Sequence, residues 1–121
     1  MQKEQLSPEQ IESRLAHFHG SEGVSRTHIN VAITDGIKFL AEECKAYWIL
    51  DNISSYQTIE KVKKERFQVI DLTVDEKGNA LMIVTDGNEN EVFRQNFWST
   101  FPLKKIRLYY TDGVCLLPSE Y

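Results

Sequence analysis

The spacing of hydrophobic residues changes once along the chain, close to Phe67. Upstream of this point apolar residues recur every three or four positions, and downstream they recur every second position. The first spacing is typical of amphipathic helices, and the second is typical of strands. The sequence therefore predicts helices in the first half of the chain and a sheet in the second half.

The first helix is predicted to begin after Ser7. Ser7 can cap the helix, Pro8 occupies the first helical position, and Gln10 is placed to complete a capping box. Its apolar stripe consists of Ile11, Leu15 and Phe18. The helix is expected to end near Gly20. Residues 1–6 are predicted to be a flexible terminus, and residues 20–30 a loop with room for one edge strand.

A second helical pattern occupies residues 36–56. One face of it carries Ile37, Leu40, Ala41 and Cys44, and a further apolar set runs from Tyr47 towards Tyr56. The sequence leaves open whether this segment is one helix or two helices with a break near Lys45. The charged residues 57–66 that follow are interpreted as a solvated connection.

Strands are predicted at residues 67–74, 80–85, 91–98, 103–110 and 114–117, with turn residues between them. The connections are too short for crossover helices, so consecutive strands are expected to pair antiparallel. The sequence therefore predicts an α+β fold with two to three N-terminal helices packed on a four- to five-stranded antiparallel meander sheet. All 121 residues are expected to form a single domain.

Composition narrows the classes of partner. The formal net charge is -4, which opposes broad attraction to phosphate backbones or anionic lipid. No apolar run approaches the ~20 residues of a membrane-spanning helix. The chain has two cysteines and no leader-like N-terminal segment, so we expect a cytoplasmic protein with reduced thiols and no membrane association.

Motifs that could support chemistry are few. Thr-Asp-Gly occurs at residues 34–36, 85–87 and 111–113, which is interpreted as turn chemistry, and residues 86–91 do not complete a calcium-binding loop. The histidines His17, His19 and His28, even with Cys44, lack the paired spacing of a zinc site. Both cysteines occupy apolar positions, and phosphate-binding or hydrolase motifs are missing. We therefore expect no catalytic residue, metal or cofactor.

The aromatic residues at positions 47–56 and 93–121 are the feature of the sequence that most suggests a binding surface. They include Tyr47, Trp48, Tyr56, Phe93, Phe97, Trp98, Phe101, Tyr109, Tyr110 and Tyr121. These are too many for one face of a small sheet, so some are expected to be exposed, and exposed aromatic residues commonly anchor protein interfaces.

Segments of the sequence also resemble a known group of proteins. These segments are residues 41–43, 46–51 with the pattern Tyr-Trp-x-Leu-Asp, 67–69, and the closing residues 116–121 with Pro-Ser-Glu-Tyr. From about His17 to the end, the chain resembles a family of small bacterial single-domain proteins of unknown function. The resemblance implies no activity, cofactor or catalytic residue, and the occurrence of members in genomes rich in plasmids and phages implies a mobile-element role. Residues 42–45 depart from the Gly- and Ala-rich stretch expected there.

The leading hypothesis is a non-enzymatic protein-binding module, acting as an inhibitor or accessory factor encoded by a mobile element, with another protein as its partner. The candidate binding residues are Tyr47, Trp48, Asp51, Gln57, Tyr109 and Tyr110. A homodimer is also consistent with the pattern, because a bare sheet edge or face needs cover. The alternative is a small-ligand binder or enzyme with a pocket at Tyr47, Asp51 and Gln57. A further alternative is nucleic-acid binding through Lys61 to Arg66, which the net charge disfavours.

Overall fold

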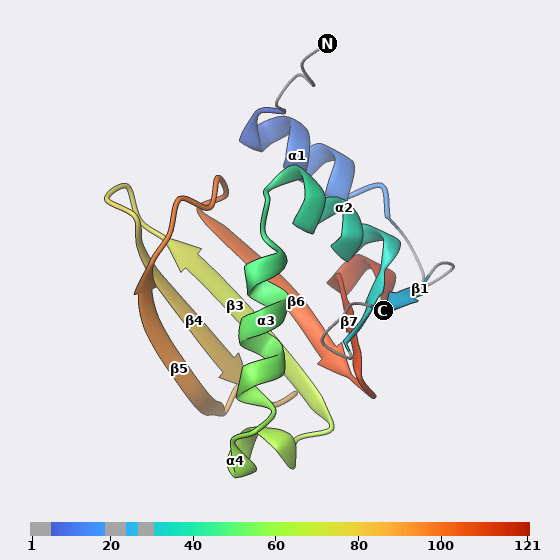
Figure 1. Ribbon diagram of the computed structural model, residues 1–121, viewed down its shortest axis with the longest axis vertical. Helices are drawn as coiled ribbons and strands as arrows, with labels where there is room; N and C mark the ends of the chain where they lie inside the picture. The colour runs from blue at the N-terminus through green and yellow to red at the C-terminus, as the bar shows by residue number, and fades with distance from the viewer. Residues whose placement is uncertain (1–5, 19–23, 27–30) are drawn as a thin grey trace.

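The computed structural model describes residues 6–18, 24–26 and 31–121, and has α+β architecture. Its helices are α1 (Pro8–Leu15), α2 (Asp35–Glu43), α3 (Tyr47–Tyr56) and α4 (Glu60–Lys63), with a 3-10 turn at Pro118–Glu120. Its strands are β1 (Val24–Arg26), β2 (Ala32–Thr34), β3 (Phe67–Val74), β4 (Asn79–Thr85), β5 (Glu91–Trp98), β6 (Lys105–Thr111) and β7 (Val114–Leu116). The helix α3 lies across one face of the sheet (Figure 1).

The sheet differs from the predicted antiparallel meander of four to five strands. In the described residues it has seven strands in the order β1-β2-β7-β6-β3-β4-β5. The pair β2 and β7 is parallel, so the sheet is mixed. The five strands predicted downstream of Phe67 are all present, and the pairs that they form with one another are all antiparallel.

The meander prediction is wrong at the connection between β5 and β6. Residues 99–104, called here the crossover segment, carry the chain past both β4 and β3, so that β6 pairs with the far side of β3 instead of with β5. The additional strands β1 and β2 each span three residues, which is too short to show a period of two in the sequence. The edge strand allowed for in residues 20–30 is β1, which lies at the end of the sheet as described and pairs with β2.

The segment 36–56 forms two helices. Lys45 lies between them with a φ of 52°, and the N–H of Ala46 donates to the carbonyl of Ala41 at 2.8 Å. This is a left-handed helix end that usually takes glycine. The capping box at Ser7 is confirmed, since Gln10 N–H donates to the Ser7 hydroxyl and Gln10 Oε1 accepts from the Ser7 N–H. Helix α1 ends at Leu15, earlier than the predicted end near Gly20.

Residues 57–66 are not a simple solvated connection. They contain α4, whose Val62 is fully buried. Leu6, placed in the predicted flexible terminus, packs against the core, whereas residues 1–5 lie outside the described part of the chain. Among the described residues, no helix is long and apolar enough to cross a membrane.

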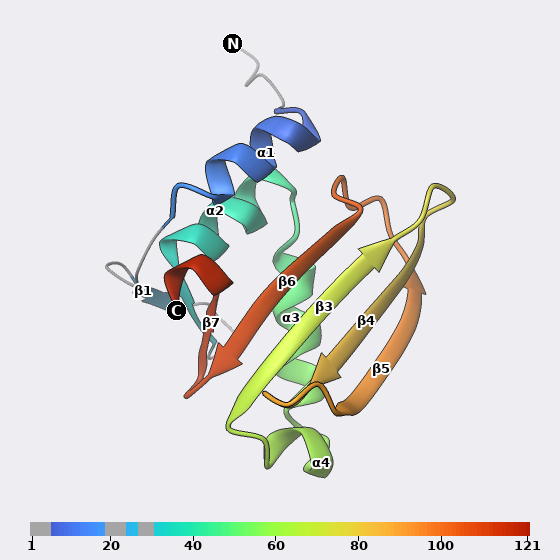
Figure 2. The ribbon, with the colours of Figure 1, turned by 180° about the vertical axis from the view of Figure 1, so that it is seen from behind.

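The core lies between the helices and one face of the sheet. Alternation along β3 turns Ile70 and Leu72 towards α3, whose Ile49 and Ile53 are fully buried in the same cluster. Met82, Val84 and Leu108 from the neighbouring strands complete this layer. The opposite face of β3, β4 and β6 is covered by no helix of the described chain, as Figure 2 shows. We call it the helix-free face.

Candidate interaction surface

The helix-free face is formed by alternate side chains of three paired strands. The residues that point to it are Phe67, Val69, Asp71 and Thr73 from β3, Leu81, Ile83 and Thr85 from β4, and Lys105, Arg107, Tyr109 and Thr111 from β6. Register places Ile83, Asp71 and Arg107 in one row across the strands. The face therefore combines apolar and charged side chains at defined positions.

One end of this face carries three mutually packed aromatic rings. The ring centroids of Phe67 and Tyr109 lie 4.9 Å apart, and Tyr121 approaches Phe67 at 5.3 Å and Tyr109 at 5.6 Å. Both Tyr121 contacts are edge-to-face, a favoured geometry for aromatic pairs. Tyr121 is nevertheless 74% exposed. We call Phe67, Tyr109 and Tyr121 the aromatic trio; it presents ordered aromatic surface to solvent.

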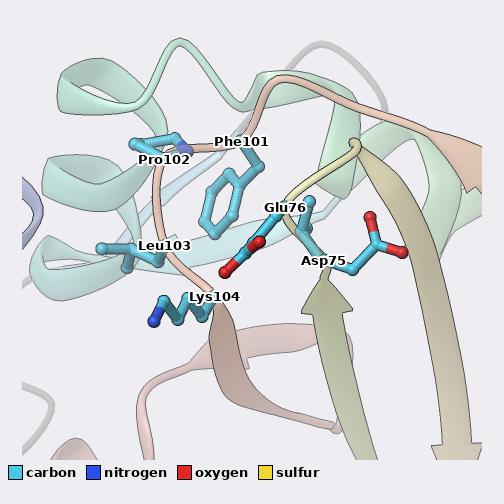
Figure 3. A pocket seen from close by; sticks show the side chains of 7 residues that line it. Asp75, Glu76, Phe101, Pro102, Leu103 and Lys104 are labelled. Carbon is cyan, nitrogen blue, oxygen red and sulfur yellow. The ribbon is translucent and has the colours of Figure 1, made fainter.

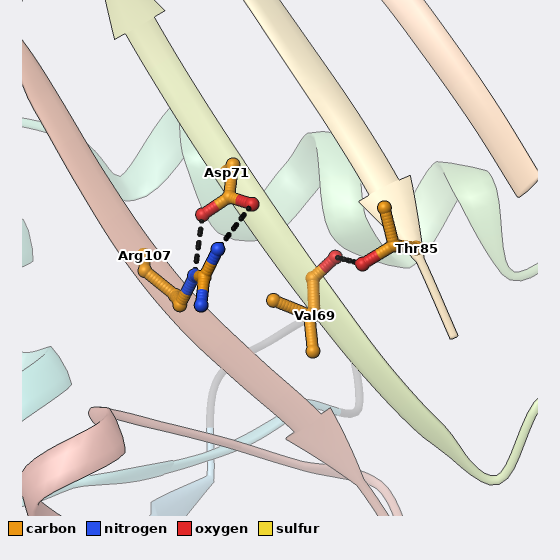
Figure 4. Close-up of polar contacts among 4 residues, drawn as sticks. All are labelled: Val69, Asp71, Thr85 and Arg107. Carbon is orange, nitrogen blue, oxygen red and sulfur yellow. Dashed lines mark hydrogen bonds and ion pairs between the residues drawn. The ribbon is translucent and has the colours of Figure 1, made fainter. Parts of the chain in front are cut away.

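The centre of the face carries a bidentate ion pair. Arg107 Nε and Nη2 donate to the two carboxylate oxygens of Asp71 at 2.8 and 3.1 Å, across the β3–β6 pair (Figure 4). The Asp71 carboxylate is the main cause that raises the pKa of Arg107 above its ordinary value. An exposed pair of this kind contributes at most about 1 kcal/mol to stability. Its fixed fork geometry is suited to orienting a polar partner group.

Beside this face, β5 forms one edge of the sheet. On it, Arg94 and Glu91 form a second exposed ion pair at 2.5 Å. Charged side chains of this kind discourage another strand from pairing with an edge strand. The long edge is therefore less available for association than the helix-free face.

The structure separates the residues that the sequence suggested as one pocket. Tyr47 and Asp51 are exposed on α3, one helical turn apart, and the Tyr47 hydroxyl lies 3.5 Å from Glu42 Oε1. This carboxylate and partial burial raise the pKa of Tyr47, with burial the larger cause. Gln57 points inward instead.

Gln57 forms a reciprocal amide pair with Gln68 of β3. Gln57 Nε2 donates to Gln68 Oε1 at 2.8 Å, and Gln68 Nε2 donates to Gln57 Oε1 at 2.9 Å. Gln68 is only 1% exposed, and its Nε2 also lies within hydrogen-bonding distance of the carbonyls of Val62 and Glu65. The Gln57 amide thus joins the end of α3 to the sheet.

Tyr109 and Tyr110 are adjacent in β6 and point to opposite faces. Tyr109 belongs to the aromatic trio, whereas Tyr110 packs partly against the core, and burial is the main cause that raises its pKa. Of the six candidate binding residues, Tyr109 is therefore the one on the helix-free face. Phe67, Asp71 and Arg107 were not among the candidates. Alternation along β3 groups Phe67 with Asp71, but the β3–β6 pairing that adds Arg107 has no local signal.

Trp48 lies at the other end of the molecule, beside the crossover segment. Its indole packs edge-on against Phe97 at 5.5 Å and Phe101 at 6.3 Å. A pocket of about 270 Å³ separates the crossover segment from the β3–β4 hairpin, and Figure 3 shows Phe101 and Leu103 on one side of it and Glu76 on the other. The end of the sheet near Trp48 is thus hollowed.

The other motifs have structural roles where they are described. The first Thr-Asp-Gly begins α2, and the second and third form turns after β4 and β6. At the β4–β5 turn, Asp86 accepts hydrogen bonds from the Asn90 side chain and from the N–H groups of Asn90 and Asn88, and these bonds, the side-chain one above all, lower its pKa. This agrees with the interpretation as turn chemistry.

No group of three or more potential metal ligands occurs within residues 6–18, 24–26 and 31–121. His19 and His28 lie outside these ranges, so the structure does not place the histidine cluster. The basic residues Lys61, Lys63, Lys64 and Arg66 are all exposed, in and directly after α4. They do not lie on the strands that form the helix-free face.

Comparison with known proteins gives a match to a family model. The model of a family of unknown function, DUF6876, matches residues 9–121. No curated protein and no solved structure matches the chain.

Proposed function

From the premise that the chain belongs to the DUF6876 family of unknown function, we propose that it is a non-enzymatic protein-binding module whose contact surface is the helix-free face. The observation that carries this proposal is the aromatic trio, which is ordered by ring contacts and still exposed at Tyr121.

Antiparallel sheets commonly have one solvated face, so a bare face alone is no evidence of binding. The composition of this face supports the proposal. Tyrosine, phenylalanine and arginine are enriched at the centres of protein interfaces, where rigid aromatic side chains lose little conformational entropy on binding. Here two tyrosines, a phenylalanine and Arg107 lie on adjoining positions of β3, β6 and the C-terminal residue.

The ion pair supplies the polar part of the proposed surface. Asp71 and Arg107 hold each other in a fixed orientation, so a partner group that bonds to either meets a preorganised site. The partner that fits is a protein with an apolar patch for the aromatic trio and a polar group placed for this pair. We include in the proposal that the chain acts as a cytoplasmic inhibitor or accessory factor encoded by a mobile element.

The first experiment is site-specific photo-crosslinking in the native host. A benzophenone amino acid is placed at Thr73, an exposed position of the helix-free face, and in a matched chain at Asp51, exposed on α3. The proposal expects a defined protein crosslinked from residue 73 and not from residue 51. The same product from both positions, or only from residue 51, contradicts it.

The second experiment measures affinity for the identified partner, which includes the chain itself if the product is a homodimer. Tyr109→Ala and Tyr121→Ala are each expected to raise the Kd by at least about 5-fold, the usual lower limit for an interface anchor. Tyr47→Ala removes an exposed tyrosine from α3 and serves as the control, with the Kd unchanged. Loss of binding only on Lys63→Glu with Lys64→Glu would place the contact on the basic residues at α4 and contradict the proposal.

A further inference from the structure

Trp98 is exposed and yet held in one orientation. Its indole Nε1 donates to the carbonyl of Lys77 at 3.1 Å. The indole also lies close over Gly78, because a Cβ at that position would be 2.5 Å from Nε1 and 2.9 Å from Cε2. These contacts fix the ring against the β3–β4 hairpin, while Trp98 remains 67% exposed. An aromatic surface ordered in advance binds a ligand at lower entropic cost.

Trp98 lines a pocket together with the only other tryptophan of the chain. This tryptophan pocket has a volume of about 240 Å³ and is lined by Trp48, Phe97, Trp98, Ser99 and Thr100. Trp48 is held by its edge-on contact with Phe97. The Ser99 hydroxyl oxygen accepts a hydrogen bond from the N–H of Phe101 at 3.0 Å, so this hydroxyl can still donate its hydrogen.

A second pocket of about 180 Å³ adjoins the first, since Trp48 and Thr100 line both. It adds one acidic and one basic residue, Glu43 and Lys45. The charges along the combined pocket therefore balance, which favours an uncharged ligand over an anion or a cation. The tryptophan pocket itself, at about 240 Å³, lies below the ~300–1,000 Å³ of sites for drug-sized ligands, so the ligand that it holds is small.

We infer that the tryptophan pocket binds a neutral carbohydrate through a single pyranose ring. The face of an indole ring is electronegative, and the C–H groups on the face of a sugar ring are weakly positive, so the two stack. The sugar's hydroxyl groups lie at the edge of its ring, where Ser99 and Thr100 offer hydroxyl partners. A purely apolar ligand would leave the hydroxyls unused, and an organic cation would gain nothing from the balanced charges. This site is separate from the aromatic trio and does not depend on the proposed protein partner.

The test uses the full chain and its two indole N–H signals in a ¹H–¹⁵N correlation spectrum. The probes are methyl α-glucopyranoside, methyl β-galactopyranoside, methyl α-mannopyranoside and N-acetylglucosamine. Cyclohexanol serves as an apolar ring with one hydroxyl, and choline serves as an organic cation. At least one sugar is expected to shift both indole signals saturably, with a lower Kd than cyclohexanol and choline.

Two variants test the contacts separately. Trp98→Ala is expected to raise the sugar Kd at least about 5-fold, as loss of an aromatic anchor does. Thr100→Val keeps the shape of the side chain and removes its hydroxyl, and is expected to raise the Kd by about 2- to 10-fold. Tyr121→Ala, a change at the most exposed aromatic residue of the described chain, is the control and leaves the Kd unchanged.

The inference is overturned if none of the four sugars gives a saturable shift of the indole signals. Equal affinity for cyclohexanol would show a general apolar site, and binding of choline alone would show a cation site. Sugar binding that persists unchanged in Trp98→Ala, with the remaining spectrum intact, would place the sugar elsewhere.

Discussion

The side chain of Glu120 bonds to the backbone of Gly36, with the Gly36 N–H donating to Glu120 Oε2 at 3.1 Å. The other carboxylate oxygen accepts from the Thr34 hydroxyl at 2.5 Å and from the Leu117 N–H at 3.1 Å. Glu120 is only 3% exposed. A carboxylate at the first turn of α2 also meets the positive end of the helix dipole. The Pro-Ser-Glu-Tyr terminus therefore joins the last turn of the chain to the start of a helix more than eighty residues earlier.

Replacing this carboxylate should destabilise the fold. Glu120→Ala leaves three buried donors without their acceptor, and hydrogen bonds to a charged group contribute about 1.5–3 kcal/mol each when a partner is removed. Allowing for partial relaxation, we expect the free energy of unfolding to fall by about 2–4 kcal/mol in urea titrations. The slope of the titration should stay the same. A loss below about 0.5 kcal/mol would show that the contact does not stabilise the protein.

Gly36→Ala tests the same junction from the helix side. Alanine is the better helix former, but its Cβ would lie 2.5 Å from Leu117 Cδ1 and 2.6 Å from Glu120 Oε1. Overpacking of this kind typically costs about 1–3 kcal/mol. Gly87→Ala is the matched control, since its Cβ would make only an ordinary contact with Phe67 at 3.5 Å. Equal unfolding midpoints for the two variants would argue against a tight junction.

The amide pair of Gln57 and Gln68 should behave as one energetic unit. Gln68→Ala is expected to cost about 2–3 kcal/mol, because it also removes the donor to the Val62 and Glu65 carbonyls. Gln57→Ala is expected to cost about 1 kcal/mol. In a double-mutant cycle by urea unfolding, the two changes should couple by about 0.5–3 kcal/mol. Strictly additive effects would show that the two side chains act independently.

Sequence reasoning identified the elements better than their arrangement. The four longer strands downstream of Phe67 can be predicted because each has enough residues to show alternation, and the three-residue β7 can be predicted because the turn at residues 111–113 and Pro118 bound it. The position of β6 beside β3 could not be predicted from the sequence. A six-residue connection can lead to a strand beside β5 or across the end of the sheet to a strand beside β3. The sequence does not decide the division between α2 and α3, because Lys45 adopts a left-handed conformation that glycine usually takes at a helix end.

The candidate site was predictable only in part, for a related reason. Exposed aromatic residues were expected, and Tyr109, Trp98 and Tyr121 are indeed exposed or partly exposed. Gln57 is a candidate, with Tyr47 and Asp51, for a pocket between the helices and the sheet, whereas its amide pairs with Gln68. Its partner Gln68 stands in the inward alternation of β3 with Ile70 and Leu72, and a buried glutamine requires a hydrogen-bond partner. The alternation of β3 thus indicates that Gln68 is buried and needs a hydrogen-bond partner, but only the fold identifies Gln57 as that partner.

Alkaline conditions should destabilise the protein through its two thiols, of which Cys115 is buried and Cys44 half-buried. Burial, as the main cause, raises the pKa of Cys44 to about 11 and that of Cys115 further still. A folded pKa above the unfolded value of about 8.5 gives stability that is complete below pH 8.5 and lost as pH rises through the folded pKa. We expect unfolding free energies to decline between about pH 8.5 and 11, and both thiols to react slowly with a disulfide reagent at pH 8.

The double variant Cys44→Ala with Cys115→Ala isolates this effect. Its decline should begin only near pH 10, where the unfolded tyrosines ionise while burial holds the pKa of Tyr56 at about 12. If the double variant and the natural chain lose stability in parallel from pH 8.5, the thiols are not the cause.

The loops of the β3–β4 and β4–β5 hairpins offer a prediction in which a mutation stabilises the protein. Asp75 and Asp86 begin loops of the same pattern, and each carboxylate accepts from the N–H groups two and four residues later and from an asparagine side chain. The fourth loop position has a positive φ in both loops, 89° at Gly78 and 68° at Glu89. Glycine adopts this region freely, whereas a side chain is strained there.

Glu89→Gly should therefore raise the free energy of unfolding by about 0.5–1 kcal/mol, after subtracting the greater freedom of glycine in the unfolded chain. Gly78→Ala should do the opposite and more strongly, because its Cβ would also meet the Trp98 indole at 2.5 Å. Urea unfolding of the two variants beside the natural chain measures both shifts. Since Glu89 is exposed and its side chain lies away from the core, a loss of stability in Glu89→Gly would mean that strain in this loop is smaller than the entropic cost of glycine.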